Sequence, residues 1–442
     1  MKYLLIILWF IIFTKLFVFW LWLWQLKEYH WKRFLAHFET QALRKFLFSF
    51  SWRIQDFKYP KFTQKAKVIL VIGIIWESIF VSRNLDISNL IFSIILAPVT
   101  VSFMVLLFQI PTSILIKREL EKAKIKREGM KNLLVIGIAG SYGKTAVKEF
   151  LFEILSDKFK TLKTEKNNNA EISIARLILD KLDSSHQVLI AEIGAYEKGK
   201  IRQVCNVIKP KIGILTGINE QHLSTFGSQE NIIQAKNEIL EYPEIKIRYD
   251  DLKIFATDIV SEKESLSFKI NEVDFKVNLR RKHNIKNLLL AISCALKVGM
   301  TLEEISRACL KIKISHASIE VIEKENYTIL DTSYSANSTG VLADLNYLNT
   351  FSTKKIIVMP CLIELGSSAK SVHEKIGKRI DEVCDLGIIT TKDYFQELKQ
   401  NNEKILLIEN SQKIIKEIKK YPNSTILLEG RIPSAVKKDL CQ

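Results

Sequence analysis

With 442 residues the chain is long enough for two or three domains, and a hydrophobic fraction of 48% provides material for substantial cores. The formal net charge of +17 is of the kind seen in nucleic-acid-binding proteins. Most of that charge lies in two stretches, because residues 25–67 hold ten Lys and Arg against three acids and residues 117–132 hold seven against three. Both stretches adjoin long apolar segments, so we interpret the basicity as a membrane-topology signal and expect no nucleic-acid partner. The six scattered cysteines include no C-x-x-C pair, which argues against a disulfide framework or a zinc site and fits a reducing compartment.

Three apolar segments occupy the front of the chain. Residues 3–24 are apolar except for Thr14 and Lys15 and are long enough to span a bilayer. A signal peptide would be shorter and would be followed by a cleavage site of small residues. Residues 68–82 and 89–116 are separated by six residues, so we expect them to pair as a hairpin. The alternative is that this hairpin is re-entrant or interfacial and does not form two spans.

The two basic stretches define the expected orientation, because Lys and Arg accumulate on the cytoplasmic side of a membrane. Three spans would then leave the amino terminus outside and place everything after residue 117 in the cytoplasm. We therefore predict a multi-pass cell-membrane protein that has the lipid bilayer as a partner. Residues 25–58 mix aromatic and basic side chains, as an amphipathic helix at the membrane surface does.

After the second basic stretch, short apolar strands alternate with amphipathic helices. This alternation predicts an α/β fold with parallel sheets covered by helices on both faces. We expect two such domains with a boundary near 312–320. The expected strands are 133–138, 188–192 and 212–216 in the first domain, and 328–331, 355–359, 386–390, 405–408 and 425–428 in the second.

A glycine-rich loop follows the first expected strand and precedes a helix. Its sequence is Gly140-Ser141-Tyr142-Gly143-Lys144-Thr145, and the glycines allow backbone N–H groups and the helix N-terminus to face an anion. Lys144 is placed to bind terminal phosphates and the Thr145 hydroxyl to coordinate Mg²⁺. A strict phosphate loop would have glycine at position 138, where this sequence has Ile138. The alternative is an ordinary strand–turn–helix corner.

Four segments resemble the Mur ligases, which join amino acids or peptides to cell-wall precursors. G-I-A-G-S-Y-G-K-T-A-V-K-E-F-L resembles their nucleotide loop, residues 191–240 their central-domain signature, and K-H-N-I-K-N-L-L-L-A (282–291) their adenine-binding turn. Residues 330–345 and 360–377, with P-C-L-I-E-L-G followed by His and Gly, are similar to the carboxy-terminal domain of the D-alanyl-D-alanine-adding branch, the MurF ligases. The resemblance covers about residues 130–440.

The resemblance implies an ATP-dependent ligase that forms a peptide bond through an acyl phosphate, in peptidoglycan synthesis. The implied substrates are a muramoyl-peptide precursor and D-Ala-D-Ala, with other cell-wall enzymes as further partners. The implied organisation is a membrane region over 1–127, an ATP-binding central domain of phosphate-loop type over 128–315, and a Rossmann-like carboxy-terminal domain over 316–442. The nucleotide site would comprise Gly140, Ser141, Gly143, Lys144, Thr145, Asn284, Asn287 and Asp331.

The resemblance also implies a Mg²⁺ site made by Thr145, Glu192, His222 and Lys236, and catalytic roles for Lys144, His222 and Lys236. Lys236 matches a lysine that family members carbamylate with CO₂, which turns a cation into an anion. Taken singly, Glu192 is equally a solvated strand-end carboxylate, His222 a loop histidine and Lys236 a surface lysine. The run 167–169 of three asparagines lies near the expected acceptor site and is equally a turn signal.

The sequence departs from the family in the surfaces that close over ATP. Ser318 stands where an arginine is expected, Thr332 where a second aspartate is expected, and Arg281 where a glycine is expected. The later K-G-S element is replaced by 429–431, Glu-Gly-Arg. Altered geometry, with Arg281 or Lys324 substituting for the lost cation, and slow or lost catalysis both remain open.

Membrane segments also replace the soluble domain that holds the UDP part of the precursor in MurF relatives. Three hypotheses follow from that replacement. The first is a MurF-like ligase, and the second is a related ligase whose carboxylate acceptor is lipid-linked. The third is a degenerate nucleotide-binding scaffold that docks cell-wall enzymes at the membrane.

Overall fold

The computed structural model describes residues 2–36, 59–83, 86–165, 168–261, 265–279, 284–312, 319–333 and 336–441. The chain forms two compact units, Met1–Arg118 and Glu119–Gln442. The predicted domain boundary at 315–316 and two of the departures from the family, Arg281 and Ser318, lie outside the described residues.

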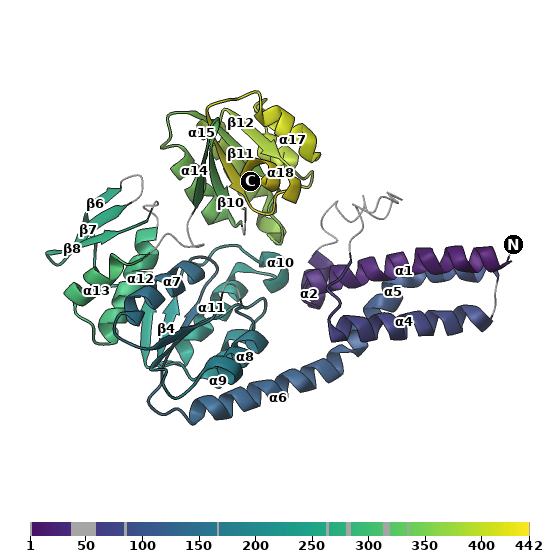
Figure 1. Ribbon diagram of the computed structural model, residues 1–442, viewed down its shortest axis with the longest axis horizontal. Helices are drawn as coiled ribbons and strands as arrows, with labels where there is room; N and C mark the ends of the chain where they lie inside the picture. The colour runs from purple at the N-terminus through teal and green to yellow at the C-terminus, as the bar shows by residue number, and fades with distance from the viewer. Residues whose placement is uncertain are drawn as a thin grey trace. The chain divides into compact units, whose positions relative to one another are not determined.

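The first unit is helical, and its three long helices lie side by side (Figure 1). Phe13, Phe17 and Trp24 are fully buried between these helices, and Gly73 allows close approach because a Cβ there would lie 2.2 Å from the Phe17 ring. Large apolar side chains also cover the outside, where Ile95 is 65% exposed. A helical unit that is apolar inside and outside fits a lipid environment. The elements are α1 (Lys2–Leu26), α2 (Trp31–Ala36), α4 (Gln64–Arg83), α5 (Ile87–Leu107) and the start of α6 (Gln109–Glu128).

Among the described residues, two segments are long and apolar enough to cross a membrane, Tyr3–Leu26 and Ile87–Glu128. They contain the first and third predicted spans. The second predicted span falls on α4, which at 20 residues is longer than the predicted 68–82 but does not reach the same apolar threshold. It stays a prediction. Of the predicted surface helix over 25–58, α2 covers Trp31–Ala36, and residues 37–58 lie outside the described part of the chain.

The second unit begins with a five-stranded parallel sheet in the order β2-β3-β1-β4-β5. The strand β1 lies in the middle, and the chain order reverses on either side of it, which is where ligands bind in open α/β sheets. The strands are β1 (Leu134–Ala139), β2 (Thr161–Lys163), β3 (Val188–Glu192), β4 (Ile212–Leu215) and β5 (Ile245–Arg248). The helices are α7 (Lys144–Ser156), α8 (Glu171–Lys181), α9 (Lys200–Ile208), α10 (Leu223–Phe226), α11 (Gln229–Glu241) and the short η3 (Tyr249–Asp251).

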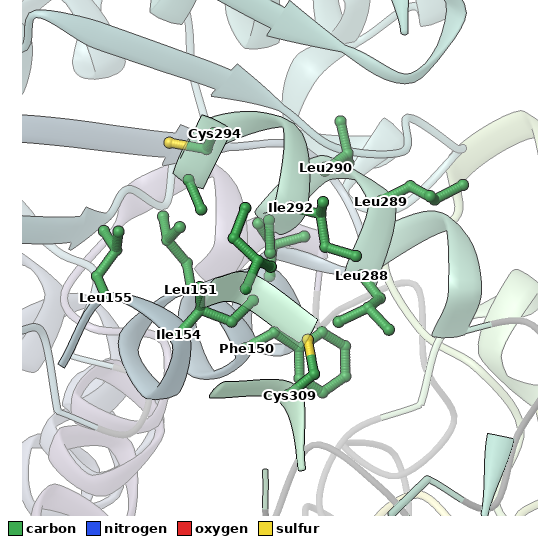
Figure 2. Close-up of a cluster of buried hydrophobic side chains, with 14 of the residues drawn as sticks. Phe150, Leu151, Ile154, Leu155, Leu288, Leu289, Leu290, Ile292, Cys294 and Cys309 are labelled. Carbon is green, nitrogen blue, oxygen red and sulfur yellow. The ribbon is translucent and has the colours of Figure 1, made fainter. Parts of the chain in front are cut away.

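The glycine-rich loop 140–145 is called the phosphate loop below, after its predicted role. The helix that follows it is held by a large apolar cluster (Figure 2). Its buried residues recur at helical spacing, as Val147, Phe150, Leu151, Ile154 and Leu155, and give α7 one apolar face. Figure 2 shows that face packed against two later helices, whose labelled residues include Leu288 and Cys309. These are α12 (Asn284–Lys297) and α13 (Leu302–Cys309), which follow a small antiparallel sheet of β6 (Thr257–Ser261), β7 (Leu266–Ile270) and β8 (Val273–Val277).

The remainder of the second unit is built on a second sheet in the order β13-β12-β11-β14-β10-β9. Its strands run parallel except for β9, which pairs antiparallel with β10. The strands are β9 (Glu320–Lys324), β10 (Tyr327–Thr332), β11 (Lys354–Met359), β12 (Leu386–Ile389), β13 (Ile405–Leu407) and β14 (Ser424–Glu429). The helices are α14 (Ser338–Leu348), η4 (Gly366–Ser368), α15 (Ala369–Val383), α16 (Phe395–Lys399), α17 (Ser411–Ile418) and α18 (Ser434–Cys441).

The predicted α/β architecture is therefore confirmed, and each predicted strand has its counterpart in one of the two parallel sheets. The antiparallel sheet β6–β8 was not predicted. Below, the part of the second unit that carries the first sheet is called the central domain, and the part that carries the second sheet is called the C-terminal domain.

Candidate active site

The phosphate loop lies at the carboxyl end of β1, in the middle of the central sheet. Gly140 has φ 147° and Gly143 has φ 82°, conformations that a side chain would strain. A Cβ at Gly140 would lie 2.1 Å from the Thr216 hydroxyl, so the close approach of β4 also requires glycine there. Ser141 and Tyr142 both donate their backbone N–H to Gly217, which fixes the loop against the end of β4. The helix α7 then starts at Lys144 with its N-terminal N–H groups directed toward the loop.

Lys144 is folded back over the loop. Its ammonium donates to the carbonyls of Gly140 at 2.9 Å and Ser141 at 3.0 Å. Burial lowers the pKa of this ammonium, and the negative charge of Glu192 opposes that shift. A lysine held in this way places one positive charge where terminal phosphates would bind.

Glu192, at the end of β3, is only 2% exposed, and three side-chain donors contact its carboxylate. The Thr145 hydroxyl donates to Oε2 at 3.0 Å, Asn169 Nδ2 donates to Oε1 at 3.2 Å, and Lys148 Nζ lies 3.2 Å from Oε2. This environment excludes the interpretation of Glu192 as a solvated carboxylate. It also brings the predicted residues Thr145 and Glu192 into direct contact.

Lys148 was missed by the sequence analysis. Its side chain is fully buried and also lies 3.4 Å from Glu149. A buried charge is stable only when it is paired, so Lys148 fits this position because Glu192 is there. The available signal was its position on α7, one turn beyond Lys144 and inside a run of apolar residues. Asn169 belongs to the predicted asparagine run, of which Asn167 lies outside the described residues.

Lys236 projects from α11 and is 2% exposed, so the surface-lysine interpretation is wrong. Its Nζ donates to the Ala195 carbonyl at 2.9 Å and lies 5.4 Å from the centre of the Phe226 ring. Burial is the main reason that its pKa falls to about 7, and repulsion from Lys144 adds to the shift while Glu238 opposes it. An amine with this pKa is about half neutral at pH 7 and largely neutral above it, and the neutral amine is the state that reacts with CO₂.

His222 precedes α10 with φ 66°, in the left-handed region. Its Nδ1 lies 2.7 Å from Oε2 of Glu364 in the C-terminal domain. The ring also meets the edge of Tyr196, with centroids 4.7 Å apart at 85°. Since Tyr196 follows the carbonyl that binds Lys236, one short segment joins the surroundings of His222 and Lys236.

Asn284 and Asn287 lie in the first turn of α12, next to the phosphate loop. A Cβ at Gly143 would lie 2.5 Å from Oδ1 of Asn287, so this amide touches the loop. Asn287 Nδ2 donates to Oδ1 of Asn284 at 3.5 Å. Asn284 is 2% exposed, and within the described residues its Nδ2 is a buried donor without a hydrogen-bond partner. Such a donor fits a site that receives a polar ring such as adenine.

Asp331 is the predicted residue that is engaged elsewhere. It is the penultimate residue of β10, and its carboxylate lies 2.7 Å from Lys437 Nζ and accepts the Ser333 N–H at 2.9 Å. Burial alone would raise the pKa of Asp331, but hydrogen bonds from Lys437 and Ser333 lower it overall. At the neighbouring departure from the family, the Thr332 hydroxyl donates to the buried Glu429 at 2.7 Å. Both contacts lie within the C-terminal domain.

The donor set can be tested against a magnesium ion. Mg²⁺ prefers oxygen ligands and commonly takes a few from protein and the rest from phosphate and water. Thr145 and Glu192 meet this requirement, whereas the ammonium of Lys236 offers no lone pair until it is carbamylated. Among the described residues there is no cluster of three or more His, Cys, Asp or Glu. The residues therefore fit a metal that is held jointly with nucleotide phosphates.

A glycine-rich loop at the switch point of one parallel sheet, followed by a domain with a second, mostly parallel sheet, is the architecture of an α/β nucleotide-binding fold. Residues 138–253 match the Mur ligase middle domain. The UDP-N-acetylmuramoyl-tripeptide–D-alanyl-D-alanine ligase of Borreliella burgdorferi is 30% identical over 307 residues, covering 61% of this chain and 63% of that protein. The equivalent ligase of Bacillus subtilis is 25% identical over 303 residues, covering 61% and 65%. The chain thus spans less than two thirds of the length of these two relatives.

Solved structures show the same fold. MurF from Acinetobacter baumannii superposes with a TM-score of 0.69 at 23% identity and covers 74% of this chain and 80% of its own. MurF from Thermotoga maritima in complex with ADP gives 0.66 at 21% identity and covers 74% and 84%. The chain is therefore similar to the Mur ligase middle domain over residues 138–253, and the fold of its α/β domains is that of the MurF structures.

Proposed function

We propose that this protein is an ATP-dependent peptide ligase that adds D-Ala-D-Ala to a muramoyl-tripeptide precursor in peptidoglycan synthesis. The observation that carries the proposal is the arrangement of Lys144, Thr145, Glu192 and Lys236 at the carboxyl ends of β1 and β3. Relatives named for this reaction support the choice of substrates.

The chemistry explains why these side chains are needed. A carboxylate is a poor electrophile at neutral pH, and ATP with Mg²⁺ supplies the phosphoryl group that activates it as an acyl phosphate. Lys144 neutralises charge where phosphates and carboxylate repel each other. Glu192 accepts the Thr145 hydroxyl and so orients it, and Lys148 pairs with the Glu192 carboxylate. An incoming amine then displaces phosphate from the activated carbonyl through a tetrahedral intermediate.

We infer that Lys236 acts in its carbamylated form. The neutral amine attacks the carbon of CO₂, forms an N–C bond and loses a proton, which leaves a carbamate anion. A pKa of about 7 supports this step, because the free amine is available near neutral pH. The anion would lie near the positive charge of Lys144, which stabilises it. His222 and the carbamate would complete the Mg²⁺ site together with Thr145 and Glu192.

We also propose that the first unit anchors the protein as a multi-pass cell-membrane protein with both α/β domains in the cytoplasm. The apolar segments Tyr3–Leu26 and Ile87–Glu128 support the anchor, and the basic stretches 25–67 and 117–132 support the orientation. A reporter that is active only in the cytoplasm is expected to be active when it is fused after residue 131. A signal from the outer side of the membrane would contradict this topology.

The acceptor is either the soluble UDP-linked precursor or its lipid-linked form. We place the UDP-linked precursor first, with the membrane unit as an anchor, because the named relatives act on it. The lipid-linked form is the second candidate, because the basic stretch 25–67 adjoins a membrane segment and could bind a diphosphate at the bilayer surface. Turnover of the two acceptors by the full-length protein in lipid vesicles separates them.

The function is tested by phosphate release from ATP with the full-length protein in detergent. Release is expected only when ATP, Mg²⁺, the UDP-linked tripeptide and D-Ala-D-Ala are all present, and omission of any one should abolish it. Binding of ADP without turnover on either acceptor would contradict the ligase proposal and favour the scaffold.

A further inference from the structure

The segment 360–366 of the C-terminal domain presents a carboxylate to the central domain. Glu364 lies in this segment with φ 63°, and its side chain is 6% exposed. Besides the contact of its carboxylate with His222, its backbone carbonyl accepts the Ser224 N–H at 3.3 Å. Glu364 therefore contacts both ends of the turn that begins α10. Its left-handed backbone costs free energy and persists only where the surroundings hold it.

A buried histidine holds this segment in place. His373 on α15 is fully buried, and its Nδ1 lies 2.6 Å from the Ala369 carbonyl, which can only accept. Nε2 therefore carries the lone pair, and it accepts the Leu362 N–H at 2.9 Å. Burial lowers the pKa of His373 and favours this neutral form. The P-C-L-I-E-L-G…H signature thus has a physical basis, because its histidine fixes the segment that presents its glutamate.

The contact with Glu364 bears on which nitrogen of the His222 ring carries the proton. An ionised carboxylate can only accept, so Nδ1 of His222 must carry the proton, and in the neutral ring the lone pair is then on Nε2. Histidines that bind metals usually donate their other ring N–H to a carboxylate in this way. The edge contact with Tyr196 further restricts the ring.

A second contact joins the two domains near the phosphate loop. Asn219, which follows β4, donates through Nδ2 to Asn337 Oδ1 at 3.2 Å and to the Thr339 hydroxyl at 3.1 Å. Asn219 also accepts the Ser141 hydroxyl through its carbonyl at 3.4 Å. The C-terminal domain therefore contacts the central domain at both ends of the segment 219–224.

We propose that Glu364 is a positioning residue of the ligase: the C-terminal domain supplies the carboxylate that sets the tautomer and orientation of His222. Docking of the C-terminal domain and completion of the phosphate site are then one event. The kinetic consequence rests on the proposed function, whereas the contact itself can be tested without it.

The experiment compares full-length wild type, Glu364→Ala and Glu364→Gln in detergent, with Glu325→Ala as the control. Glu325 is an exposed carboxylate of the same domain, in the turn between β9 and β10. Hydrogen exchange is measured by mass spectrometry over residues 222–227, where the amides of Thr225, Phe226 and Gly227 bond to His222 and Leu223 and the amide of Ser224 bonds to Glu364. The Mg²⁺ concentration that half-saturates ADP binding is measured by calorimetry, and kcat and KM are measured where turnover is found.

Glu364→Ala is expected to speed exchange over 222–227 and to raise the required Mg²⁺ by about 10- to 100-fold, the usual cost of losing an outer carboxylate partner. Where turnover is found, Glu364→Ala should lower kcat and leave KM for D-Ala-D-Ala unchanged. Glu364→Gln, whose amide oxygen can still accept, should recover part of both effects, and Glu325→Ala should match wild type.

Two results would overturn the inference. Unchanged exchange over 222–227 in both Glu364 variants would show that the contact does not hold α10. Faster exchange with an unchanged Mg²⁺ requirement would reduce Glu364 to a structural contact. A wild type that binds ADP with Mg²⁺ but forms no peptide bond would contradict the proposed function alone. Hydrogen exchange and the Mg²⁺ dependence of ADP binding would still test the contact between Glu364 and His222.

Discussion

The two domains of the second unit treat their charged residues differently. In the central domain, Lys148, Glu192 and Lys236 are nearly or fully buried, and their charges converge on one end of a parallel sheet. In the C-terminal domain, Asp331 is neutralised by Lys437 on α18, and Thr332 hydrogen-bonds to Glu429. The central domain thus gathers buried charged side chains at one end of its sheet, whereas the named pairs of the C-terminal domain include partly exposed groups such as Lys437.

Burying several charged side chains close together lowers stability unless they are paired or bind a ligand. In the central domain such buried charges, Lys148, Glu192 and Lys236, lie around the phosphate loop. In the C-terminal domain, the departure from the Mur ligase pattern at Thr332 is accommodated locally by Glu429, and this domain contacts the central domain through Glu364 and Asn337. The comparison shows that the contacts around Lys144 and Glu192 in the central domain do not involve Thr332 or Glu429.

The largest effect is expected from Lys148→Met, which removes the buried cation and leaves Glu192 without its ionic partner. Loss of one member of a buried pair typically lowers the free energy of unfolding by about 3–5 kcal/mol. Thermal unfolding of the full-length protein in detergent measures the loss. Lys246→Met, at an exposed position on β5, is the matched control and should change stability little. Equal stability of the two variants would mean that Lys148 is not structurally coupled to Glu192.

Lys144→Ala should come next, acting on turnover. One preorganised charge contact in the phosphate site corresponds to about 10²- to 10³-fold in rate. The fold should survive, because the apolar face of α7 that packs on α12 is untouched. Phosphate release under saturating substrates measures the effect, and circular dichroism checks the fold. Turnover equal to wild type would exclude this loop as the phosphate site.

Lys236 gives a third test with a pH dependence. Lys236→Ala and Lys236→Arg should both lower turnover by about 10- to 100-fold, because neither can form a carbamate. Since the pKa of Lys236 is about 7, the reactive amine is protonated below that pH and neutral above it. Carbamate occupancy, followed by ¹³C NMR with labelled bicarbonate, should therefore rise as pH increases through about 7.

Retention of activity by Lys236→Arg would assign the residue a purely cationic role. Absence of a bicarbonate-dependent carbamate signal in the wild type at alkaline pH would remove the carbamylation proposal, even if both variants lost activity.

The smallest effect is expected at the C-terminal pair. Lys437 is about half exposed, so Lys437→Ala should lower stability by no more than about 1 kcal/mol. The pKa of Asp331 is lowered in the folded protein. Its contribution is therefore present above the ordinary carboxyl pKa and is lost as pH falls through the lowered value. Melting curves at several pH values, with exposed Lys438→Ala as the control, should show the difference disappearing in acid.

Strand and helix types in the second unit were predictable because buried parallel strands leave continuous apolar runs. The antiparallel sheet β6–β8 was missed, since its strands, such as Thr257–Ser261, are short and half polar. Within the site, the spacing around Lys144 and Thr145 was sufficient to predict the loop. The position of Lys148 inside the apolar run of α7 was a signal of its burial, but its pairing with Glu192 was not predictable, because Glu192 lies on β3, far away in the chain. The contact of His222 with Glu364 joins residues 142 positions apart in the chain, and local sequence carries no signal for such pairing.

The central claim is that the protein activates a carboxylate by phosphorylation before an amine attacks it. The most direct measurement uses an acceptor whose terminal carboxylate is labelled with ¹⁸O, incubated with full-length protein, ATP, Mg²⁺ and D-Ala-D-Ala. Mass spectrometry should find ¹⁸O transferred to the released phosphate and D-Ala-D-Ala joined to the acceptor. Phosphate released without label, or with no new peptide bond, would contradict the account.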